Sequence, residues 1–238
     1  MDALILAAGQ GSRLKEGRAK CLVDLGGRPL IHHQLEALRD AGVERFVVVA
    51  GYQAPLVARA LPAGATVVLN RRYAETNSLY SFLLARRAVG RELVVLNSDV
   101  LFHPLIGQMV ARFTSSALAY DSSSGDEVEQ MKVVVRRGEL AAMSKTLAPE
   151  RSCGENVGII RLSGAATRAA FDAAARIVVG GGERDWLPAA IAAIAAEHPV
   201  TCLDVAGLPW VEIDFPEDLR HARASVLPAL TGALASAA

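Results

Sequence analysis

The feature that most strongly limits the possible folds of this chain is the alternation of short apolar runs with helical patterns. Five runs in the first half have the continuous apolar character of buried strands: residues 3–8, 45–50, 66–69, 92–96 and 117–120. Helical patterns separate them, at residues 30–41, 55–61, 78–89 and 104–113. Apolar strands connected by helices are typical of parallel sheets with helices on both faces. The first half therefore predicts an α/β fold with a Rossmann-like, doubly wound and mostly parallel sheet.

The second half has a different pattern, which predicts a mixed extension of that sheet. Runs at residues 131–136 and 139–143 flank Arg137 and Gly138, which is typical of a hairpin. After them come a strand at 157–162, Ala-rich helices at 164–177 and 186–196, short strands at 200–203 and 210–213, and a final helix. No long linker or internal repeat interrupts the chain, so we expect residues 1–238 to form one domain.

Charge and cysteine content exclude several classes of function. Lys and Arg together number 25, as do Asp and Glu, so no overall basic field favours nucleic acid. The three cysteines are far apart without a Cys-x-x-Cys pair, which indicates a reducing compartment and no disulfide scaffold or zinc site. The Ala-rich run at 189–196 is too short to span a bilayer. We therefore expect a cytoplasmic protein that binds neither nucleic acid nor membrane.

A glycine-rich loop after the first strand is the strongest functional motif. Gly9 and Gly11 allow a ligand to approach the backbone, and amide groups in such a turn point at phosphate oxygens. Four cations follow within eight residues: Arg13, Lys15, Arg18 and Lys20. That density favours a triphosphate, although a strand–helix turn with solvated charges remains the alternative.

Two familiar nucleotide motifs fit this loop less well. A dinucleotide fingerprint requires glycine where Leu14 stands. A Walker A loop requires Gly-Lys-Ser or Gly-Lys-Thr at its end, and the segment has neither. An oxidoreductase that uses NAD is therefore disfavoured.

Together with Lys20-Cys21-Leu22-Val23 and residues 27–31, the loop at residues 6–14 resembles the NTP-transferase family that activates sugar phosphates. Residues 70–73 and 77–81 are similar to the nucleotide-binding turn of its smaller members, the choline-phosphate and phosphonate cytidylyltransferases. Residues 97–99 and 212–214 are similar to their two metal positions. The resemblance covers nearly the whole chain.

This resemblance implies a nucleotide-diphospho-sugar transferase fold and a nucleotidyltransferase activity. CTP is the implied donor, a small phosphonate or phosphorylated substrate the acceptor, and pyrophosphate the leaving product. Residues 1–121 would be the nucleotide-binding half and residues 122–238 the acceptor-binding half. A sugar 1-phosphate with UTP or dTTP is the alternative within the family. A non-catalytic nucleotide-binding regulatory domain is the alternative from another class, and a homodimer is left open.

The resemblance also assigns the nucleotide and catalytic residues. We expect the nucleotide to contact residues of the loop and of the segment before the third helix: Leu6, Ala7, Ala8, Gly9, Gly11, Ser12, Arg13, Asn77 and Ser78. Arg13 is expected at the triphosphate and the leaving pyrophosphate, and Lys20 at the α-phosphate and the incoming oxygen. Asn77 and Ser78 fit a helix N-cap equally well.

Two aspartates are the expected ligands of Mg²⁺. Asp99 follows the fourth strand at the carboxyl edge, where open α/β sheets bind ligands, and Asp214 follows the last short strand. Asp214 with Glu217 also fits a capping box. Glu212 is expected to be a weaker candidate, because strand alternation would point it away from Asp214. Asp121 follows the fifth strand without a motif.

The acceptor pocket is expected in the second half, from Lys132, Lys145, Glu155 and Asn156. Residues 122–159 contain no aromatic side chain that would cage a choline cation. The two lysines favour an acceptor with a second anionic group, whereas solvated hairpin charges are their alternative role. Glu155 is compatible with an amine. Asn156 resembles the Asn-x-Gly strand of sugar-specific relatives.

Overall fold

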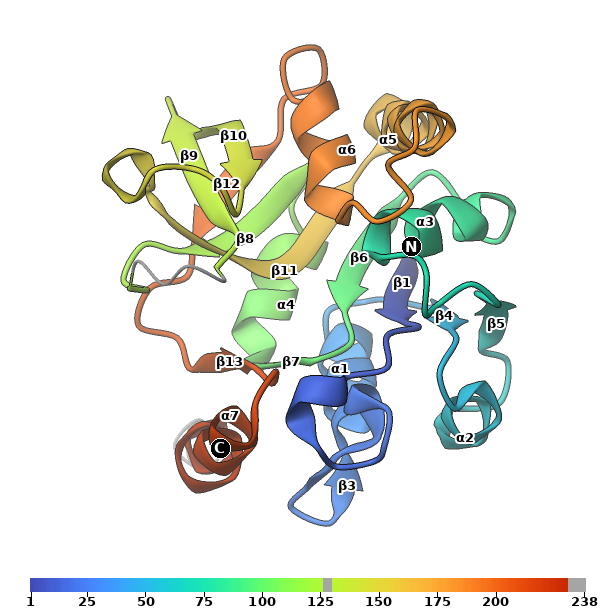
Figure 1. Ribbon diagram of the computed structural model, residues 1–238. Coiled ribbons are helices and arrows are strands. Elements are labelled where there is room, and N and C mark those ends of the chain that lie inside the picture. Colours follow the sequence, from blue (N-terminus) through green and yellow to red (C-terminus); the bar gives the residue numbers. More distant parts are fainter. Residues whose placement is uncertain (126–129, 231–238) are drawn as a thin grey trace.

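A nine-stranded sheet forms the centre of the computed structural model, which describes residues 1–125 and 130–230 (Figure 1). In spatial order, its strands are β5 (Thr66–Leu69), β4 (Arg45–Ala50), β1 (Asp2–Ala7), β6 (Leu93–Asn97), β11 (Gly154–Leu162), β8 (Ala117–Asp121), β12 (Thr201–Asp204), β10 (Glu139–Ser144) and β9 (Lys132–Arg136). The first four are parallel, and antiparallel pairs predominate beyond β6. The predicted α/β fold, parallel in its first half and mixed in its second, is confirmed.

Seven α-helices accompany the strands within the described residues: α1 (Leu30–Asp40), α2 (Ala54–Ala60), α3 (Ser78–Leu84), α4 (Pro104–Ala111), α5 (Gly164–Val179), α6 (Leu187–Ile194) and α7 (Pro216–His221). Helices α1, α2 and α4 pack on one face of the sheet, and α3, α5 and α6 on the other (Figure 1). The side chains of β1 alternate between these two cores, with Ile5 in the first and Leu4 and Leu6 in the second. Burial on both faces explains why β1 is a continuous apolar run.

The predicted hairpin at Arg137 and Gly138 is present. Strands β9 and β10 are antiparallel, and the two turn residues have φ values of 53° and 81°. Positive φ at both turn positions matches the right-handed twist of the flanking strands.

Several elements differ from the sequence-based expectation. The last short strand, β13 (Trp210–Glu212), pairs outside the main sheet with β7 (Val100–Phe102), a strand that the sequence pattern did not predict. Helix α3 ends at Leu84, and a 3-10 turn over Ala85–Arg87 replaces its predicted last residues. Strand β8 belongs to the half of the sequence that is expected to bind the nucleotide, but it lies between β11 and β12 of the second half.

A third hydrophobic core joins the glycine-rich loop to the end of the chain. Leu14 of the loop and Leu101 of β7 pack with Ile213 and with Leu219 of α7. A short hairpin of β2 (Asp24–Leu25) and β3 (Arg28–Pro29) contributes to the same cluster. This core holds residues about 200 positions apart in the sequence beside one another.

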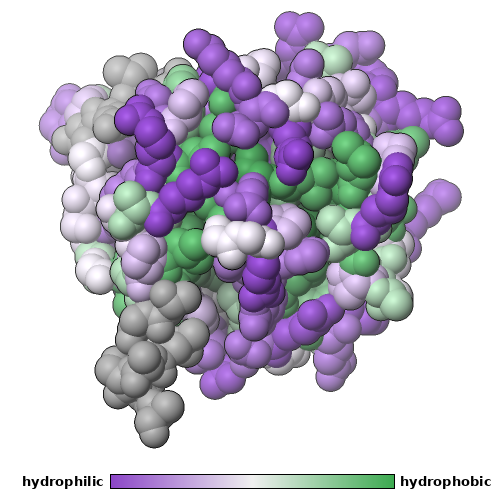
Figure 2. All heavy atoms as spheres, turned by 90° about the horizontal axis from the view of Figure 1, so that it is seen from below, coloured by the Kyte–Doolittle hydropathy of each residue, from purple (hydrophilic) through white to green (hydrophobic). Residues whose placement is uncertain are grey.

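Hydrophilic residues surround a central area of hydrophobic residues on the face seen in Figure 2. Among the described residues, no helix combines the length and apolar character that crossing a bilayer requires.

Candidate active site

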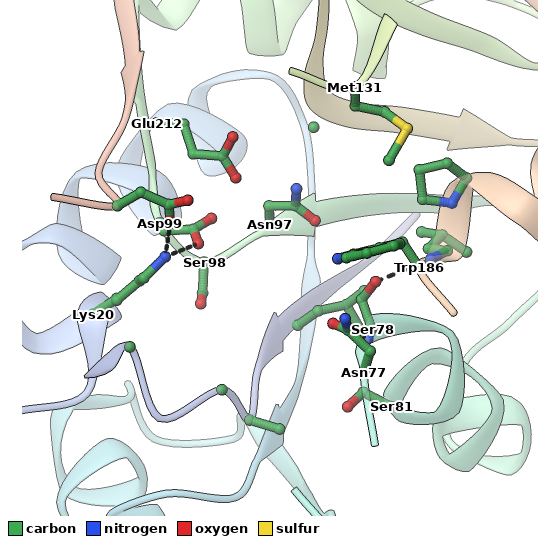
Figure 3. A pocket seen from close by; sticks show the side chains of 18 of the residues that line it. Lys20, Asn77, Ser78, Ser81, Asn97, Ser98, Asp99, Met131, Trp186 and Glu212 are labelled. Atoms are coloured by element: carbon green, nitrogen blue, oxygen red, sulfur yellow. Dashed lines mark hydrogen bonds and ion pairs between the residues drawn. The ribbon is translucent and has the colours of Figure 1, made fainter. Parts of the chain in front are cut away.

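A cavity of about 460 Å³ lies where the carboxyl ends of β1 and β6 meet β11 (Figure 3). Most of the expected site residues line it: Leu6, Ala8, Gly9, Gly11, Ser12, Arg13, Lys20, Asn77, Ser78, Asp99, Lys145, Asn156 and Asp214. Ala7 does not line it, because its side chain points to the core on the opposite face of β1. Ligands of open α/β sheets bind at this edge.

The glycine-rich loop bends sharply at Gly11, which has φ 60° and precedes a 3-10 turn over Ser12–Leu14. A Cβ atom at Gly11 would lie 2.6 Å from Cγ of Lys20. The absence of a side chain therefore lets the Lys20 chain pass beside the loop. Leu14, which is 1% exposed, anchors the end of the loop in the third core.

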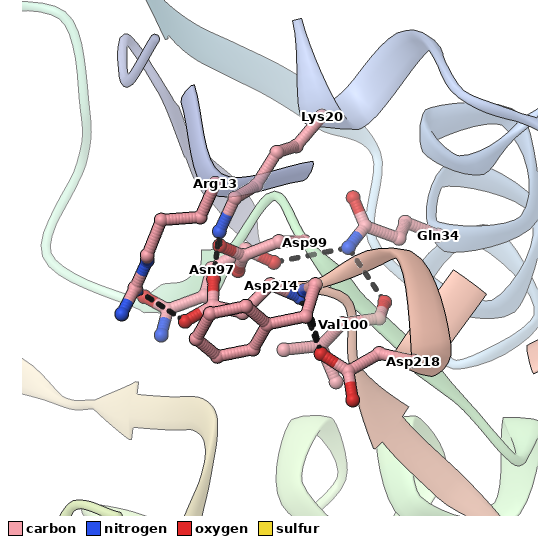
Figure 4. Close-up of polar contacts among 9 residues, drawn as sticks. Arg13, Lys20, Gln34, Asn97, Asp99, Val100, Asp214 and Asp218 are labelled. Atoms are coloured by element: carbon pink, nitrogen blue, oxygen red, sulfur yellow. Dashed lines mark hydrogen bonds and ion pairs between the residues drawn. The ribbon is translucent and has the colours of Figure 1, made fainter. Parts of the chain in front are cut away.

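Lys20 and Arg13 meet two carboxylates at one end of the cavity (Figure 4). Lys20 Nζ donates to Asp99 at 2.9 Å and also to Asp214. Burial alone would lower the pKa of Lys20, but the charges of Asp99 and Asp214 outweigh it and raise that pKa above its ordinary value. Lys20 is therefore a cation throughout the physiological pH range.

Two contacts hold Arg13 at the same end of the cavity as Lys20. Its guanidinium donates to Asp214, and its Cζ lies 5.0 Å from the centroid of the Phe215 ring. Both contacts come from the segment between β13 and α7, which the third core places beside the loop.

Asp99, Glu212 and Asp214 offer oxygen atoms that all lie within 4.8 Å of one another. Such a set suits a hard divalent cation. The expectation that Glu212 points away from Asp214 was wrong, because residues two apart along an extended chain share a face. Burial, with the charges of Asp99 and Asp214, raises the pKa of Glu212 to about 8. A cation at this site would favour its ionised form.

The capping role considered for Asp214 belongs to another residue. The Asp218 carboxylate accepts from the backbone N–H groups of Asp214 and Phe215, at 2.9 and 2.7 Å. Asp218 therefore stabilises the start of α7, and the carboxylate of Asp214 faces Lys20.

Gln34 of α1 supports the turn that presents Asp99. Its amide donates to the carbonyl oxygens of Asn97 and Val100, at 2.9 and 2.8 Å (Figure 4). Gln34 is 1% exposed. Gln34 stands at an apolar position of the predicted helix, and this was the signal that would have identified it as a residue with a structural role in the site.

At the other end of the cavity, Asn77 and Ser78 have structural contacts of their own. The Asn77 side chain accepts from the backbone N–H of Ser78 at 2.8 Å and caps α3. Ser78 Oγ accepts from the backbone N–H of Leu187 at 2.9 Å. Asn77 N–H also donates to the carbonyl oxygen of Glu183. These bonds connect the two halves of the chain at the cavity wall.

The four residues expected at the acceptor lie in different places. Lys145 and Asn156 line the cavity, and Lys145 Nζ lies 5.1 Å from the Trp186 ring centroid. Lys132 is 3% exposed, donates to the Lys145 carbonyl oxygen at 3.5 Å and lines neither cavity described here. Glu155 lines a neighbouring cavity of about 290 Å³, which shares Glu212 and Asp214 with the first.

That neighbouring cavity also contains Asp121. The Asp121 carboxylate accepts from Trp210 Nε1 at 2.8 Å and from Ser123, so its oxygens hold the chain around β8 and β13 together.

Gly158 brings β11 close to the end of β6. It has φ 83°, and a Cβ there would lie 2.8 Å from Asn97 Nδ2. Asn156 Oδ1 is buried without a partner among the described residues. The Asn-x-Gly motif indicated Asn156 and Gly158, whereas nothing in the sequence pattern indicated Asn97 as their neighbour.

Two known proteins are similar to this chain over more than nine-tenths of its length. The chain is 32% identical over 238 residues to the bifunctional IPC transferase and DIPP synthase of Rubrobacter xylanophilus, with 95% of this chain and 52% of the relative covered. It is 30% identical to the CMP-5'-(3-aminopropyl)phosphonate synthase of Streptomyces rubellomurinus, with 92% and 38% covered. The chain thus spans about half or less of the length of these relatives.

A solved structure shares the whole architecture. The inositol-1-phosphate CTP transferase from T. maritima matches with a TM-score of 0.81 and 23% identity, over 97% of this chain and 94% of that one. The model of the MobA-like NTP transferase domain family matches residues 3–157, which include the glycine-rich loop, Lys20 and Asp99. The resemblance drawn from the motifs is confirmed, and the chain belongs to the MobA-like NTP transferase domain family.

Proposed function

We propose that this protein is a Mg²⁺-dependent cytidylyltransferase that transfers CMP from CTP to a small phosphonate or phosphorylated acceptor. The observation that supports this most strongly is the meeting of Arg13, Lys20, Asp99 and Asp214 at one end of a nucleotide-sized cavity. The similar proteins that are named a CMP-5'-(3-aminopropyl)phosphonate synthase and an inositol-1-phosphate CTP transferase support the same reaction class.

In the proposed reaction, an acceptor oxygen attacks the α-phosphorus of CTP, and the bond from that phosphorus to the oxygen bridging to the β-phosphate breaks. Pyrophosphate leaves with the electron pair of that bond. The acceptor oxygen is already ionised at neutral pH, so the protein needs to position it and to neutralise charge. Lys20 and Arg13 supply positive charge at the α-phosphate and at the leaving group.

Asp99, Asp214 and Glu212 would hold Mg²⁺, whose chemistry is to offset charge on the phosphates. Their oxygens suit a hard cation, and the cluster adjoins the phosphate loop. Because Lys20 pairs with the same aspartates, the protein keeps these carboxylates compensated with its own cations.

The test is a pyrophosphate-release assay that crosses CTP, UTP, dTTP and ATP with four acceptors: phosphocholine, aminoethylphosphonate, a carboxylated phosphonate and a hexose 1-phosphate. We expect the highest kcat/KM with CTP and a phosphonate or small phosphate ester, and none without a divalent ion. A preference for UTP or dTTP with the hexose phosphate would assign the protein to sugar activation. Nucleotide binding without turnover of any pair would favour a regulatory domain.

A further inference from the structure

The segment that leads from the glycine-rich loop to Lys20 is held from outside. Residues 16–18 are exposed and belong to no helix or strand. In the part of the chain that the structure describes, their hydrogen bonds to other segments come from two side chains that follow β4, those of Tyr52 and Gln53. The course of the backbone into Lys20 therefore depends on these side chains.

The amide of Gln53 makes two hydrogen bonds to this backbone, one on either side of Arg18. Its Oε1 accepts from the N–H of Ala19 at 3.0 Å, and its Nε2 donates to the carbonyl oxygen of Gly17 at 3.0 Å. Ala19 is 1% exposed, so its N–H needs an acceptor inside the protein, and Gln53 supplies it. One side chain thus fixes the backbone immediately before Lys20.

Gln53 has an unusual backbone conformation for its residue type. Its φ is 52° and its ψ is 31°, in the left-handed region that is unfavourable for residues other than glycine. It stands at the N-cap of α2, yet its side chain does not cap that helix. Neither the turn nor the helix explains a glutamine here, whereas the bonds to Gly17 and Ala19 do.

The effect of this clamp reaches Lys20 through one turn of the chain. Ala19 directly precedes the 3-10 turn over Lys20–Leu22, and its carbonyl oxygen accepts from the N–H of Leu22 at 2.8 Å. The side chain of Lys20 starts from this turn and ends between two carboxylates. A shift of the turn would move the ammonium of Lys20 away from the point where charge develops.

We propose that Gln53 is a positioning residue for Lys20, which it serves by clamping the backbone at Gly17 and Ala19. Gln53 lines neither of the two cavities described above, so it acts through Lys20 and not by contact with a substrate. This inference rests on the proposed role of Lys20 in the transfer of CMP.

A pair of variants separates positioning from stability. Gln53→Ala and Gln53→Gly both lack the amide, but glycine suits a φ of 52°, so Gln53→Gly should melt at the higher temperature. Both should lower kcat by about 10- to 100-fold, because small misplacements of a reacting charge have large effects on rate. Titration calorimetry with a non-hydrolysable CTP analogue should show nearly unchanged affinity.

Tyr52→Phe is the matched control from the adjacent position. It removes a hydroxyl that lies 3.5 Å from the carbonyl oxygen of Gly17 and leaves both bonds of the Gln53 amide in place. Its kcat should be that of the unmodified protein.

A double-mutant cycle tests whether Gln53 acts through Lys20. Single-turnover measurements of Lys20→Ala give the residual rate of transfer without the ammonium. Adding Gln53→Gly to Lys20→Ala should lower this rate no further, because the group that Gln53 positions is already absent.

A further loss of the same size in the Lys20→Ala background would overturn the inference, since Gln53 would then act by another route. Unchanged kcat in both Gln53 variants would overturn it too, as would a kcat that recovers with the melting temperature in Gln53→Gly. If the unmodified protein releases no pyrophosphate from CTP with any of the acceptors, the proposed function itself is contradicted, so the two failures are distinguishable.

Discussion

At the scale of single residues, the centre of the site is a balance of charges. Lys20 lies between two aspartates, and Arg13 pairs with one of them. Each cation is therefore held in position by a carboxylate, and each carboxylate by a cation. Truncating one member leaves another charge partly buried and uncompensated. The effects of single substitutions here should therefore be large and not additive.

Asp99→Asn should lower kcat by about 100-fold or more, because a neutral amide is a poorer ligand for Mg²⁺ than a carboxylate. Pyrophosphate release at saturating CTP and increasing Mg²⁺ measures this, with thermal melting to confirm that the protein folds. Asp40→Asn, an exposed carboxylate at the end of α1, is the control and should leave kcat unchanged. Full activity of Asp99→Asn in Mg²⁺ would disprove the assignment.

Lys20→Ala should reduce kcat more than nucleotide affinity, because Lys20 is assigned to the α-phosphate, where charge changes during transfer. Arg13→Ala should weaken nucleotide binding more, since Arg13 is assigned to phosphates that carry charge before and during the reaction. Titration calorimetry with a non-hydrolysable CTP analogue separates the two. Loss of binding in Lys20→Ala but not in Arg13→Ala would mean that these roles are exchanged.

At the scale of elements, the glycine-rich loop is shaped by two glycines with different constraints. Gly11 has a positive φ and lies against Lys20, whereas a Cβ at Gly9 would meet nothing within 4 Å. The structure of the protein itself therefore constrains Gly11, whereas it leaves room for a side chain at Gly9.

Gly11→Ala should lower the free energy of unfolding by about 1 kcal/mol or more, because it strains the backbone. It should also lower kcat, because it displaces Lys20. Gly9→Ala should unfold at the same temperature as the unmodified protein and bind CTP more weakly. Melting curves and CTP titrations of both variants measure this. Unchanged CTP affinity in Gly9→Ala would show that the nucleotide does not approach this part of the loop.

At the scale of the whole molecule, the cavity is shared between the two halves of the chain. Lys145 and Trp186 come from the second half and line the cavity together with residues of the glycine-rich loop of the first half. Lys132 is buried, and its ammonium donates to the carbonyl oxygen of Lys145. Of the two lysines that we propose for the acceptor, Lys145 is the one that lines the cavity.

Lys145→Ala should therefore raise KM for an acceptor with a second anionic group and leave CTP affinity unchanged. Lys132→Ala should mainly lower the melting temperature, because it empties a buried site. Steady-state kinetics with a carboxylated phosphonate and with phosphocholine measure the first effect. A higher KM for both acceptors alike, or a preference of the unmodified protein for phosphocholine, would argue against recognition of a second anion.

The sequence by itself determined the local elements and the glycine-rich loop. Continuous apolar runs identified β1, β4 and β6, and the turn chemistry of Arg137 and Gly138 identified the β9–β10 hairpin, because both follow from contacts close along the chain. Gly11 and Lys20 were likewise visible, since their spacing is local.

Only the tertiary structure decided how distant segments meet. The pairing of β13 with β7 and the third core bring Asp214 to Lys20, and no local pattern specifies that contact. Glu212 was misjudged for a local reason, because residues two apart along an extended chain share a face. The contacts of Gln34 with Asn97 and Val100 were not anticipated, because they join segments far apart in the sequence. Packing between segments far apart in the sequence sets these positions. In the sequence, this packing is visible only as single polar residues at positions that become buried.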